Sequence, residues 1–256
     1  MRTPQPSLKL QRSSVMDTLN QEIVAHLFEF WSEIGNQAEF TKTGQGYTSI
    51  LAPSHSWPSK VFITNSLIAD FEHIYDGMQH GILPNSLSIG EDKTLIEKLK
   101  LTGFKETSRV QAMCLFSGKK HPCKLPDDII VVRSLKHALE FATVASKAFG
   151  YTIHPSTICA LLGHQQFHLY LGIHLGSYAS CGIIYVDGIG NSGIHMIGVL
   201  PTYRGLGLGK RITQALLSTA VASRTNKVFL VASKLGAPIY AKLGFEPHGS
   251  LFSFKV

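Results

Sequence analysis

The spacing of apolar residues divides the first half of the chain into short helices and strands. Between residues 15 and 31, apolar side chains recur at three- and four-residue steps, which predicts an amphipathic helix that buries Val15, Leu19, Ile23, Leu27 and Phe30. A glycine-containing turn follows at 43–46. Beyond it, the pattern predicts strands over 47–52, 61–64 and 110–116, and helices over 67–78 and 92–101.

The second half begins after a stretch without periodicity. Residues 119–126 are basic and carry two prolines, which is typical of a linker between a domain at 1–118 and another at 127–256. The pattern then predicts strands over 129–133, 167–174, 178–186, 195–199, 228–232 and 251–256. It predicts helices over 135–149, 155–162, from a glycine-rich loop to about 223, and over 237–243. This order predicts an α/β domain with a mixed sheet.

Two segments resemble one another and indicate an internal repeat. Residues 95–105 (LIEKLKLTGFK) and 238–246 (PIYAKLGFE) each predict a helix that reaches a Gly-Phe pair and leads into a strand. The two halves are therefore expected to be copies of one fold. Because the first copy has no glycine-rich loop, we expect activity in the second half. The first half would then support the fold or shape an acceptor site.

Composition narrows the class of protein. The 256 residues are 44% apolar and 16% charged, which excludes wholesale disorder. No apolar run approaches the roughly 20 residues that span a bilayer. The polar, basic start of the chain does not resemble a secretory signal, and the four cysteines form no CxxC pair, which favours a reduced compartment. We therefore expect a soluble, cytoplasmic protein without membrane contact.

Charge and histidine content argue against two kinds of partner, nucleic acid and metal ions. The net charge of +7 comes from scattered lysines and arginines, so nucleic acid binding is not expected, although a phosphorylated cofactor would suit a basic surface. His164, His168 and His174 lie close in sequence, but their spacing fits a metal site poorly, so no metal is expected. The oligomeric state is left open between monomer and dimer.

The most informative segment is a loop that joins a predicted strand to a predicted helix and contains Gly205, Gly207 and Gly209. Glycines allow close backbone approach to a ligand, and the free N–H groups of the following helix favour phosphate. Such a turn can also merely pack tightly. Lys210 precedes Arg211 rather than the Ser or Thr of a Walker loop, and the GxGxG spacing differs from that of a dinucleotide loop.

Within this loop, Arg204, Gly207 and Gly209 meet the pattern Arg/Gln-x-x-Gly-x-Gly/Ala, and so resemble the acyl-CoA signature of the GNAT superfamily of N-acetyltransferases. Residues 239–246 resemble that family's second hallmark. The resemblance covers about residues 127–256, and that of the first half to a degenerate second copy is much weaker. The resemblance to the GNAT superfamily implies two tandem domains and a mixed, mostly antiparallel sheet flanked by helices. It also implies that an acetyl group is transferred from acetyl-CoA to a primary amine by direct attack of the amine. An acyl-CoA-binding sensor without turnover is the alternative.

The resemblance implies a role for each matching residue. The strand before the loop would hold the pantetheine arm through the backbone of Ile197, Gly198 and Val199. The loop would hold the pyrophosphate through Arg204, Gly205, Leu206, Gly207, Leu208, Gly209 and Lys210. Tyr240 matches the tyrosine that protonates the departing thiolate, with a packing role as the alternative. Ser233 stands where many members carry a cofactor-binding asparagine.

His195 is the candidate general base, because the family often draws its base from this strand. It lies four residues before Val199, so on an extended strand the two side chains would point to the same side. Imidazole titrates at about pH 6.5, which suits a base, although a strand histidine can also only fill space. The stretch 191–194 offers no acid that could serve instead.

The amine acceptor is left open between a small molecule and a peptide. Its pocket is expected around Phe149, Gly150, Tyr151 and His154, with a contribution from the outer strands and the N-terminal half. Acidic residues that would bind a polycation are sparse in the second half of the sequence. This scarcity argues against polyamines and aminoglycosides as acceptors.

Overall fold

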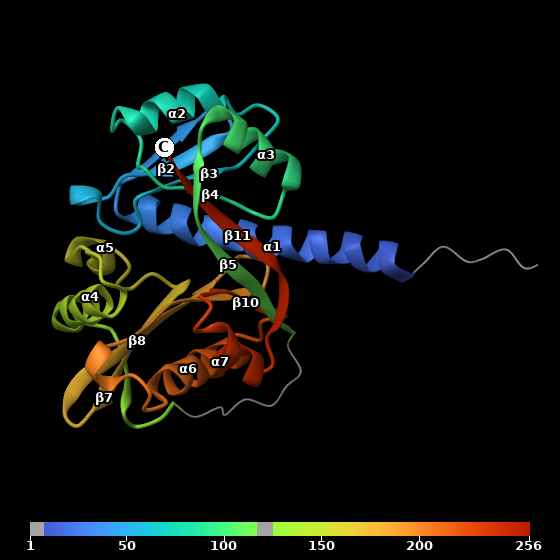
Figure 1. The fold of residues 1–256 in the computed structure, drawn as a ribbon. Helices are drawn as coiled ribbons and strands as arrows, with labels where there is room; N and C mark the ends of the chain where they lie inside the picture. The colour runs from blue at the N-terminus through green and yellow to red at the C-terminus, as the bar shows by residue number, and fades with distance from the viewer. Residues whose placement is uncertain (1–7, 117–124) are drawn as a thin grey trace, which may run out of the picture.

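The computed structural model describes residues 8–116 and 125–256 (Figure 1). Its helices are α1 (Leu8–Gln37), α2 (Phe71–Gln79), α3 (Lys93–Thr102), α4 (Leu135–Phe149), α5 (Pro155–Cys159), α6 (Leu208–Ala222) and α7 (Ala237–Lys242). Its strands are β1 (Thr41–Gly44), β2 (Tyr47–Ile50), β3 (Lys60–Ile63), β4 (Leu87–Ile89), β5 (Lys105–Phe116), β6 (Ile129–Val131), β7 (Phe167–His174), β8 (Ser177–Val186), β9 (Ser192–Val199), β10 (Lys227–Ala232) and β11 (Glu246–Lys255). Most of the predicted linker over 119–126 lies outside the described residues.

The strands of the described residues form one sheet, in the order β1-β2-β3-β4-β11-β5-β10-β9-β8-β7-β6. Neighbouring strands are antiparallel, except that β3 is parallel to β4 and β9 is parallel to β10. Helices lie on both faces of this sheet (Figure 1). The architecture confirms the predicted fold class, a mixed and mostly antiparallel sheet flanked by helices.

The order of strands is symmetric about the centre of the sheet. The first half runs β1, β2, β3, α2, β4, α3, β5, and the second contains the matching run β7, β8, β9, α6, β10, α7, β11. The last strand of each run pairs with the other half, since β5 pairs with β10 and β11 pairs with β4. The two halves of the chain therefore exchange their final strands within one continuous sheet.

The predicted repeat coincides with equivalent places in the two halves. Residues 95–105 lie on α3 and the start of β5, and residues 238–246 lie on α7 and the start of β11. Gly103 and Gly244 follow these helices with φ angles of 106° and 96°, which other residues adopt only with strain. The parallel pairs β3–β4 and β9–β10 are each joined at only two positions. The halves thus share local details as well as element order.

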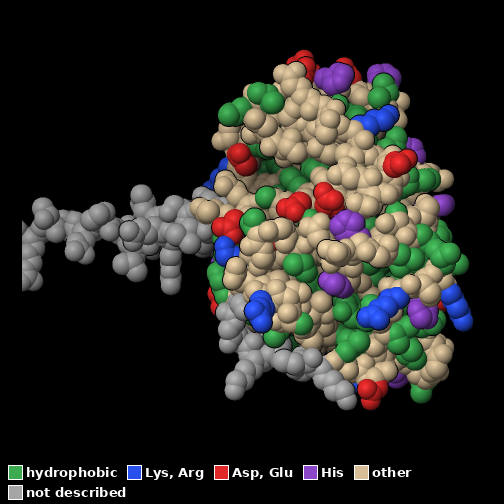
Figure 2. All heavy atoms as spheres, turned by 180° about the vertical axis from the view of Figure 1, so that it is seen from behind, with side chains coloured by type: hydrophobic (Ala, Val, Ile, Leu, Met, Phe, Trp, Pro, Cys, Tyr) green, Lys and Arg blue, Asp and Glu red, His purple; other side chains and the backbone are tan. Residues whose placement is uncertain are grey.

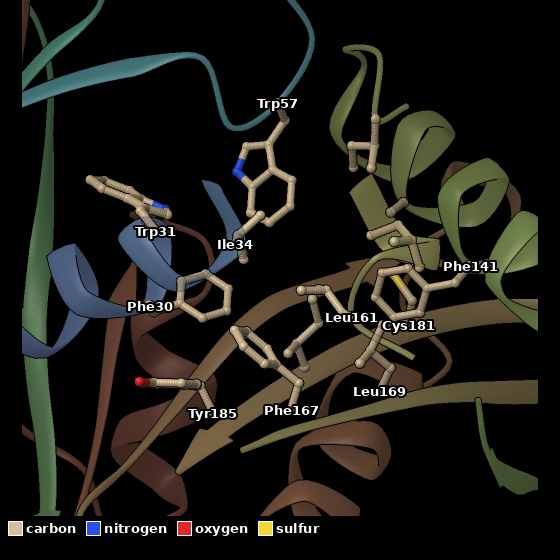
Figure 3. Packing of buried hydrophobic residues seen from close by; sticks show 14 of the residues in the cluster. Phe30, Trp31, Ile34, Trp57, Phe141, Leu161, Phe167, Leu169, Cys181 and Tyr185 are labelled. Carbon is tan, nitrogen blue, oxygen red and sulfur yellow. The ribbon is translucent and has the colours of Figure 1, made fainter. Parts of the chain in front are cut away.

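Helix α1 packs against both halves of the sheet. Its residues Phe30, Trp31 and Ile34 lie in one buried cluster with Phe167 and Tyr185 of the second half (Figure 3). Helices α4 and α5 add to this cluster, α6 contributes to a second cluster, and α2 and α3 contribute to a third in the first half. Apolar burial, at about 25 cal/mol per Å², is the main stabilising term for such clusters.

The predicted elements agree with the observed ones where the pattern is long. The helix over 135–149 and the strand over 167–174 are confirmed to the residue, whereas the helix over 15–31 extends to Leu8–Gln37. Strands β1 and β4 were not predicted, because four and three residues are too few for a period to show. The predicted helix over 155–162 is too long, since α5 ends at Cys159.

Three further findings bear on the expected class of protein. No helix within the described ranges is both long and apolar enough to cross a membrane. The described cysteines Cys114, Cys159 and Cys181 are free thiols. On the face shown in Figure 2, acidic, basic and histidine side chains are interspersed over the described residues.

Candidate active site

The glycine-rich loop leads into an open helix N-terminus. Gly205 and Gly207 have φ angles of 83° and 77°, a conformation that favours glycine. A Cβ at either position would meet no atom within 4 Å, so there is space beside the loop. Gly207 is the N-cap of α6, no side chain caps this helix, and its first turn holds no acidic residue. The free N–H groups and the positive end of the helix dipole are therefore available to an anion.

The other predicted loop residues have different surroundings. Leu206 and Lys210 are exposed, so the ammonium of Lys210 lies in solvent beside the first turn of α6. Leu208 is buried and fixes that turn to the core. A Cβ at Gly209 would contact Val199 of β9 at 3.6 Å, so the helix begins close to the strand. One side of the loop is thus packed against the protein through Leu208 and Gly209, and the other side is open to solvent at Leu206 and Lys210.

Arg204 ties the loop to the neighbouring elements. Its Nη2 donates a hydrogen bond to the carbonyl of Ala148 at 2.8 Å, and its Nε donates to the carbonyl of Val199 at 3.4 Å. Helix α4 also approaches β9 closely at Gly198, where a Cβ would lie 2.9 Å from both Ala148 Cβ and Cys181 Sγ. Arg204 therefore positions the loop, and Gly198 permits the close packing of α4 on β9.

Strands β9 and β10 diverge beside this loop. They pair only at Ser192–Val228 and at Gly193–Phe229. Beyond Gly193, no described residue of β10 pairs with β9, so the backbone groups of residues 194–199 that face β10 have no strand partner there. An extended ligand with amide groups can pair with such an edge in the way an added strand does.

A cavity with a volume of about 640 Å³ lies at this divergence. Four of the predicted catalytic and cofactor-binding residues line it: His195, Ile197, Ser233 and Tyr240. The structure therefore brings the two candidate catalytic residues to one cavity. The predicted loop residues are not part of its lining, and they lie at the end of β9 that leads into α6.

Tyr240 lies on the short helix α7. Burial raises the pKa of its phenol to about 12, so the hydroxyl keeps its proton at neutral pH. Its ring packs edge-on against Phe245 with a centroid distance of 6.1 Å. The ring thus contributes to packing, while the phenol retains a proton that it can donate.

Ser233 connects β10 to the helix that carries Tyr240. Its Oγ accepts a hydrogen bond from the N–H of Gly236 at 3.2 Å. Its carbonyl accepts hydrogen bonds from the N–H groups of Gly236 and Ala237 at 3.0 and 2.9 Å. Ser233 therefore fixes the start of α7, and its hydroxyl hydrogen can still donate to a ligand.

The prediction that His195 and Val199 point to the same side of β9 is wrong. The register between β8 and β9 shifts by one residue, and Met196 within the shift has a φ of 55°, which marks a β-bulge. The extra residue reverses the alternation of side chains. His195 consequently stacks on Phe30 of α1, while Val199 faces Gly209 on α6.

The surroundings of His195 keep its imidazole neutral. The ring stacks on Phe30 with a centroid distance of 3.8 Å, and only 7% of the residue is exposed. Burial and the nearby His26 hold the pKa of His195 well below 6.5. Nε2 is buried without a hydrogen-bond partner among the described residues. A proton on this ring is therefore unfavourable at pH 7, and any activity limb due to its titration shifts to lower pH than the sequence suggested.

A second buried histidine, which the sequence did not indicate, lies beside His195. His26 of α1 stacks on His195 at a centroid distance of 6.1 Å, and its Nε2 lies 3.8 Å from Oδ2 of Asp187. Burial lowers the pKa of His26 to about 4, although Asp187 acts in the opposite direction. A Cβ at Gly193 would overlap both rings. Across the described ranges, no group of three or more His, Cys, Asp or Glu residues could hold a metal ion.

The cavity, where the sequence predicts the acceptor, is lined by both halves of the chain. Of the residues expected there, Phe149 and Tyr151 line the cavity, whereas Gly150 and His154 do not. The N-terminal half contributes α1 and the loop 54–60, and this loop is joined to the second half by a hydrogen bond from Trp57 N–H to the carbonyl of Thr152 at 2.9 Å. Figure 3 shows Trp57 above the α1 residues that face the sheet.

A protein-family model described as an acetyltransferase (GNAT) domain matches residues 162–255. Residues 162–255 are a GNAT acetyltransferase domain. The GNAT domain contains β9 with its bulge, the glycine-rich loop, α6 and the helix that carries Tyr240. No curated protein sequence matches the chain.

Solved structures share the fold over most of the chain. A GCN5-related N-acetyltransferase from Kribbella flavida is 18% identical with a TM-score of 0.64, covering 84% of this chain and 88% of its own. One from Sphaerobacter thermophilus is 15% identical with a TM-score of 0.57, covering 88% and 84%. A tandem GNAT protein from the clavulanic acid biosynthesis pathway is 12% identical with a TM-score of 0.55, covering 77% and 74%. The shared fold therefore extends beyond the GNAT domain into the first half.

Proposed function

We propose that the chain is an acetyl-CoA-dependent N-acetyltransferase that transfers an acetyl group to a primary amine by direct attack. The observation that carries the proposal is the junction of three features in the GNAT domain. These are the open N-terminus of α6, the unpaired edge of β9 and the cavity lined by His195 and Tyr240. Together they offer an anion site, a strand edge for an extended arm and a chamber for the reaction.

The residues present fit acetyl-CoA. The space beside Gly205 and Gly207, with no acidic residue in the first turn of α6, suits a pyrophosphate. The amides of residues 205–210 would hold it, and the exposed Lys210 would add a positive charge. The backbone of residues 197–199 would hold the pantetheine arm. Ser233, at the start of α7, is the proposed donor of a further hydrogen bond.

The chain supplies groups for both proton transfers. Bound acetyl-CoA would supply an activated thioester carbonyl. Transfer to an amine requires that one proton leaves the nitrogen and that one reaches the departing sulfur. Tyr240 keeps its proton at neutral pH because burial raises its pKa, and we assign it as the donor to sulfur. His195 is neutral at pH 7 and lines the cavity, and we assign it as the acceptor of the amine proton, directly or through water.

The N-terminal half has a different role in this proposal. Between β3 and α2, at residues 64–70, it has no glycine, so it lacks a counterpart of the phosphate loop. It contributes α1 and residues 54–60 to the cavity instead. We therefore assign acetyl-CoA binding to the second half and acceptor binding to the surface between the halves.

Calorimetry and a turnover assay on the full-length protein test the proposal. Isothermal titration should detect acetyl-CoA binding, and thiol release should rise when a suitable primary amine is added. Mass spectrometry should then find the acetylated amine. Binding without turnover on any amine would support a sensor instead of an enzyme. Absence of acetyl-CoA binding would overturn both functions.

A further inference from the structure

The cavity has an unexpected charge composition for a site that takes amines. Among the residues that the structure describes, no aspartate or glutamate lines it. Apart from tyrosines, the titratable side chains in its lining are His55, Lys60 and His195. Proteins usually recognise an ammonium group with a carboxylate. The cavity lining therefore provides no such partner for a cation, and it provides one fixed cation of its own.

Lys60, at the start of β3, has no anionic partner in the described part of the chain. Its Nζ donates a hydrogen bond to Ser86 Oγ at 3.3 Å and lies 5.2 Å from the centroid of the Trp31 ring. Burial, together with Lys255, lowers the pKa of Lys60 to about 8, so the ammonium is still mostly protonated at pH 7. A half-buried ammonium held by one hydroxyl and one ring attracts an anion.

A second polar group of the same loop lacks a partner. Ser56 is 2% exposed and lines the cavity, and its Oγ has no hydrogen-bond partner among the described residues. Ser59, also in the lining, uses its hydroxyl to bond the carbonyl of Ser56 at 2.6 Å. A buried hydroxyl without a partner is unfavourable, and an oxygen of a ligand would satisfy it.

We propose that the acceptor is a small amino carboxylate, whose carboxylate binds Lys60 and Ser56 while its amine reaches the part of the cavity lined by His195 and Tyr240. This inference rests on the proposed acetyltransferase function. The ring of Trp31, over which Lys60 lies, and Trp57, the sequence neighbour of Ser56, also line the cavity and favour an acceptor with an apolar side chain.

Matched acceptors separate the charge of the acceptor from its shape. Several apolar amino acids are tested as acceptors of the full-length protein. Each is compared with its amide and with the amine that has the same side chain but lacks the carboxyl group. The amino acid should give the highest kcat/KM, by about 10- to 100-fold over the other two, as expected for a hydrogen-bonded charge. Equal rates in each series, or turnover of the amine lacking the carboxyl group alone, would overturn the proposal.

Variants then assign the preference to the two residues. Lys60→Met should lower kcat/KM for the amino acid more than for its amide and so reduce the preference for the carboxylate, and Lys60→Arg should retain part of that preference. Ser56→Ala should lower the preference several-fold. Lys98→Met is the matched control, because Lys98 also lies over a ring, 4.5 Å from the centroid of Phe71, outside the cavity. Equal losses for acid and amide in Lys60→Met would contradict the assignment.

A binding readout keeps this proposal distinct from the proposed function. Titration of the amino acid into full-length protein should detect binding that Lys60→Met weakens by at least about 10-fold, while acetyl-CoA affinity stays the same. If the amino acid binds in a way that depends on Lys60 but is not acetylated, the result would contradict the enzyme assignment and support the carboxylate site. Turnover of amines that is indifferent to a carboxylate would retain the enzyme and remove the site.

Discussion

The anion site at the start of α6 can be tested with two substitutions of equal size. Gly207 has a φ of 77°, and a Cβ there would meet no atom within 4 Å. Asn and Asp both tolerate this left-handed conformation better than other side chains. Gly207→Asn and Gly207→Asp therefore impose similar strain, about 1 kcal/mol, and differ mainly in charge.

Coulomb's law gives the expected difference in acetyl-CoA affinity between Gly207→Asp and Gly207→Asn. A carboxylate at the N-cap of α6 would lie beside a pyrophosphate that carries about two charges. At a separation of about 5 Å and an effective dielectric constant of about 40, the repulsion is about 3 kcal/mol. Gly207→Asp should therefore bind acetyl-CoA about two orders of magnitude more weakly than Gly207→Asn. The free Gly207→Asp protein should be no less stable than free Gly207→Asn, because both carry the same strain and a negative charge at the N-terminus of α6 interacts favourably with the helix dipole.

Isothermal titration and thermal melting measure the two effects separately. The difference in affinity between the two variants should shrink as salt is added, since screening weakens the repulsion. Melting temperatures of the two free proteins should agree within a few degrees or favour the aspartate. Equal acetyl-CoA affinities for Asn and Asp at low salt would show that no phosphate lies at the N-terminus of α6.

Further predictions concern protons. Tyr240→Phe should lower kcat by about 10- to 100-fold or more and leave acetyl-CoA affinity unchanged, because it removes a proton donor and keeps the packed ring. His195→Ala should lower kcat/KM and erase an acidic limb that lies below pH 6.5, because burial lowers the pKa of His195. The pKa values of His26 and His195 are both depressed in the folded state, so the unfolded chain binds more protons. Urea denaturation should therefore show stability falling as pH drops below about 6.5, by up to about 1.4 kcal/mol per pH unit for each histidine.

Each of these predictions has a result that would contradict it. Wild-type rates in Tyr240→Phe and His195→Ala, on a verified acceptor, would show that the two residues only pack and that solvent handles the protons. A pH–rate profile with the same acidic limb in His195→Ala would assign that limb to another group. Stability that does not change between about pH 7.5 and 5 would show that the buried imidazoles do not drive acid unfolding.

Much of the fold was predictable because its signals are local. The apolar spacing of α4 and the strong pattern of β7 fixed both elements to the residue. The exchange of β5 and β11 between the halves was not predictable, since it depends on pairing between residues far apart in the chain. Position-by-position alternation also failed at Met196, where a bulge inserts one residue and turns His195 towards α1.

The candidate site likewise contains residues that the sequence could indicate and residues that it could not. Gly205, Gly207 and Tyr240 lie in contiguous motifs that resemble those of the GNAT superfamily, and the roles predicted for them come from that resemblance. Lys60 and Ser56 carry no motif, and they reach the cavity only because the loop 54–60 packs on the second half. A lone lysine before a short apolar stretch is an ordinary surface residue in sequence. The proposed role of Lys60 rests on its place in the cavity and on the lack of acidic side chains among the described lining residues, and both depend on the folded structure.

The central claim is acetyl transfer to an amine, and product formation tests it most directly. Full-length protein is incubated with isotopically labelled acetyl-CoA and a panel of primary amines that includes apolar amino acids, and the amines are analysed by mass spectrometry. The account predicts labelled N-acetyl product in the presence of wild-type protein, and none above background with Gly207→Asp. Acetyl-CoA that binds the protein while every amine stays unlabelled would contradict it.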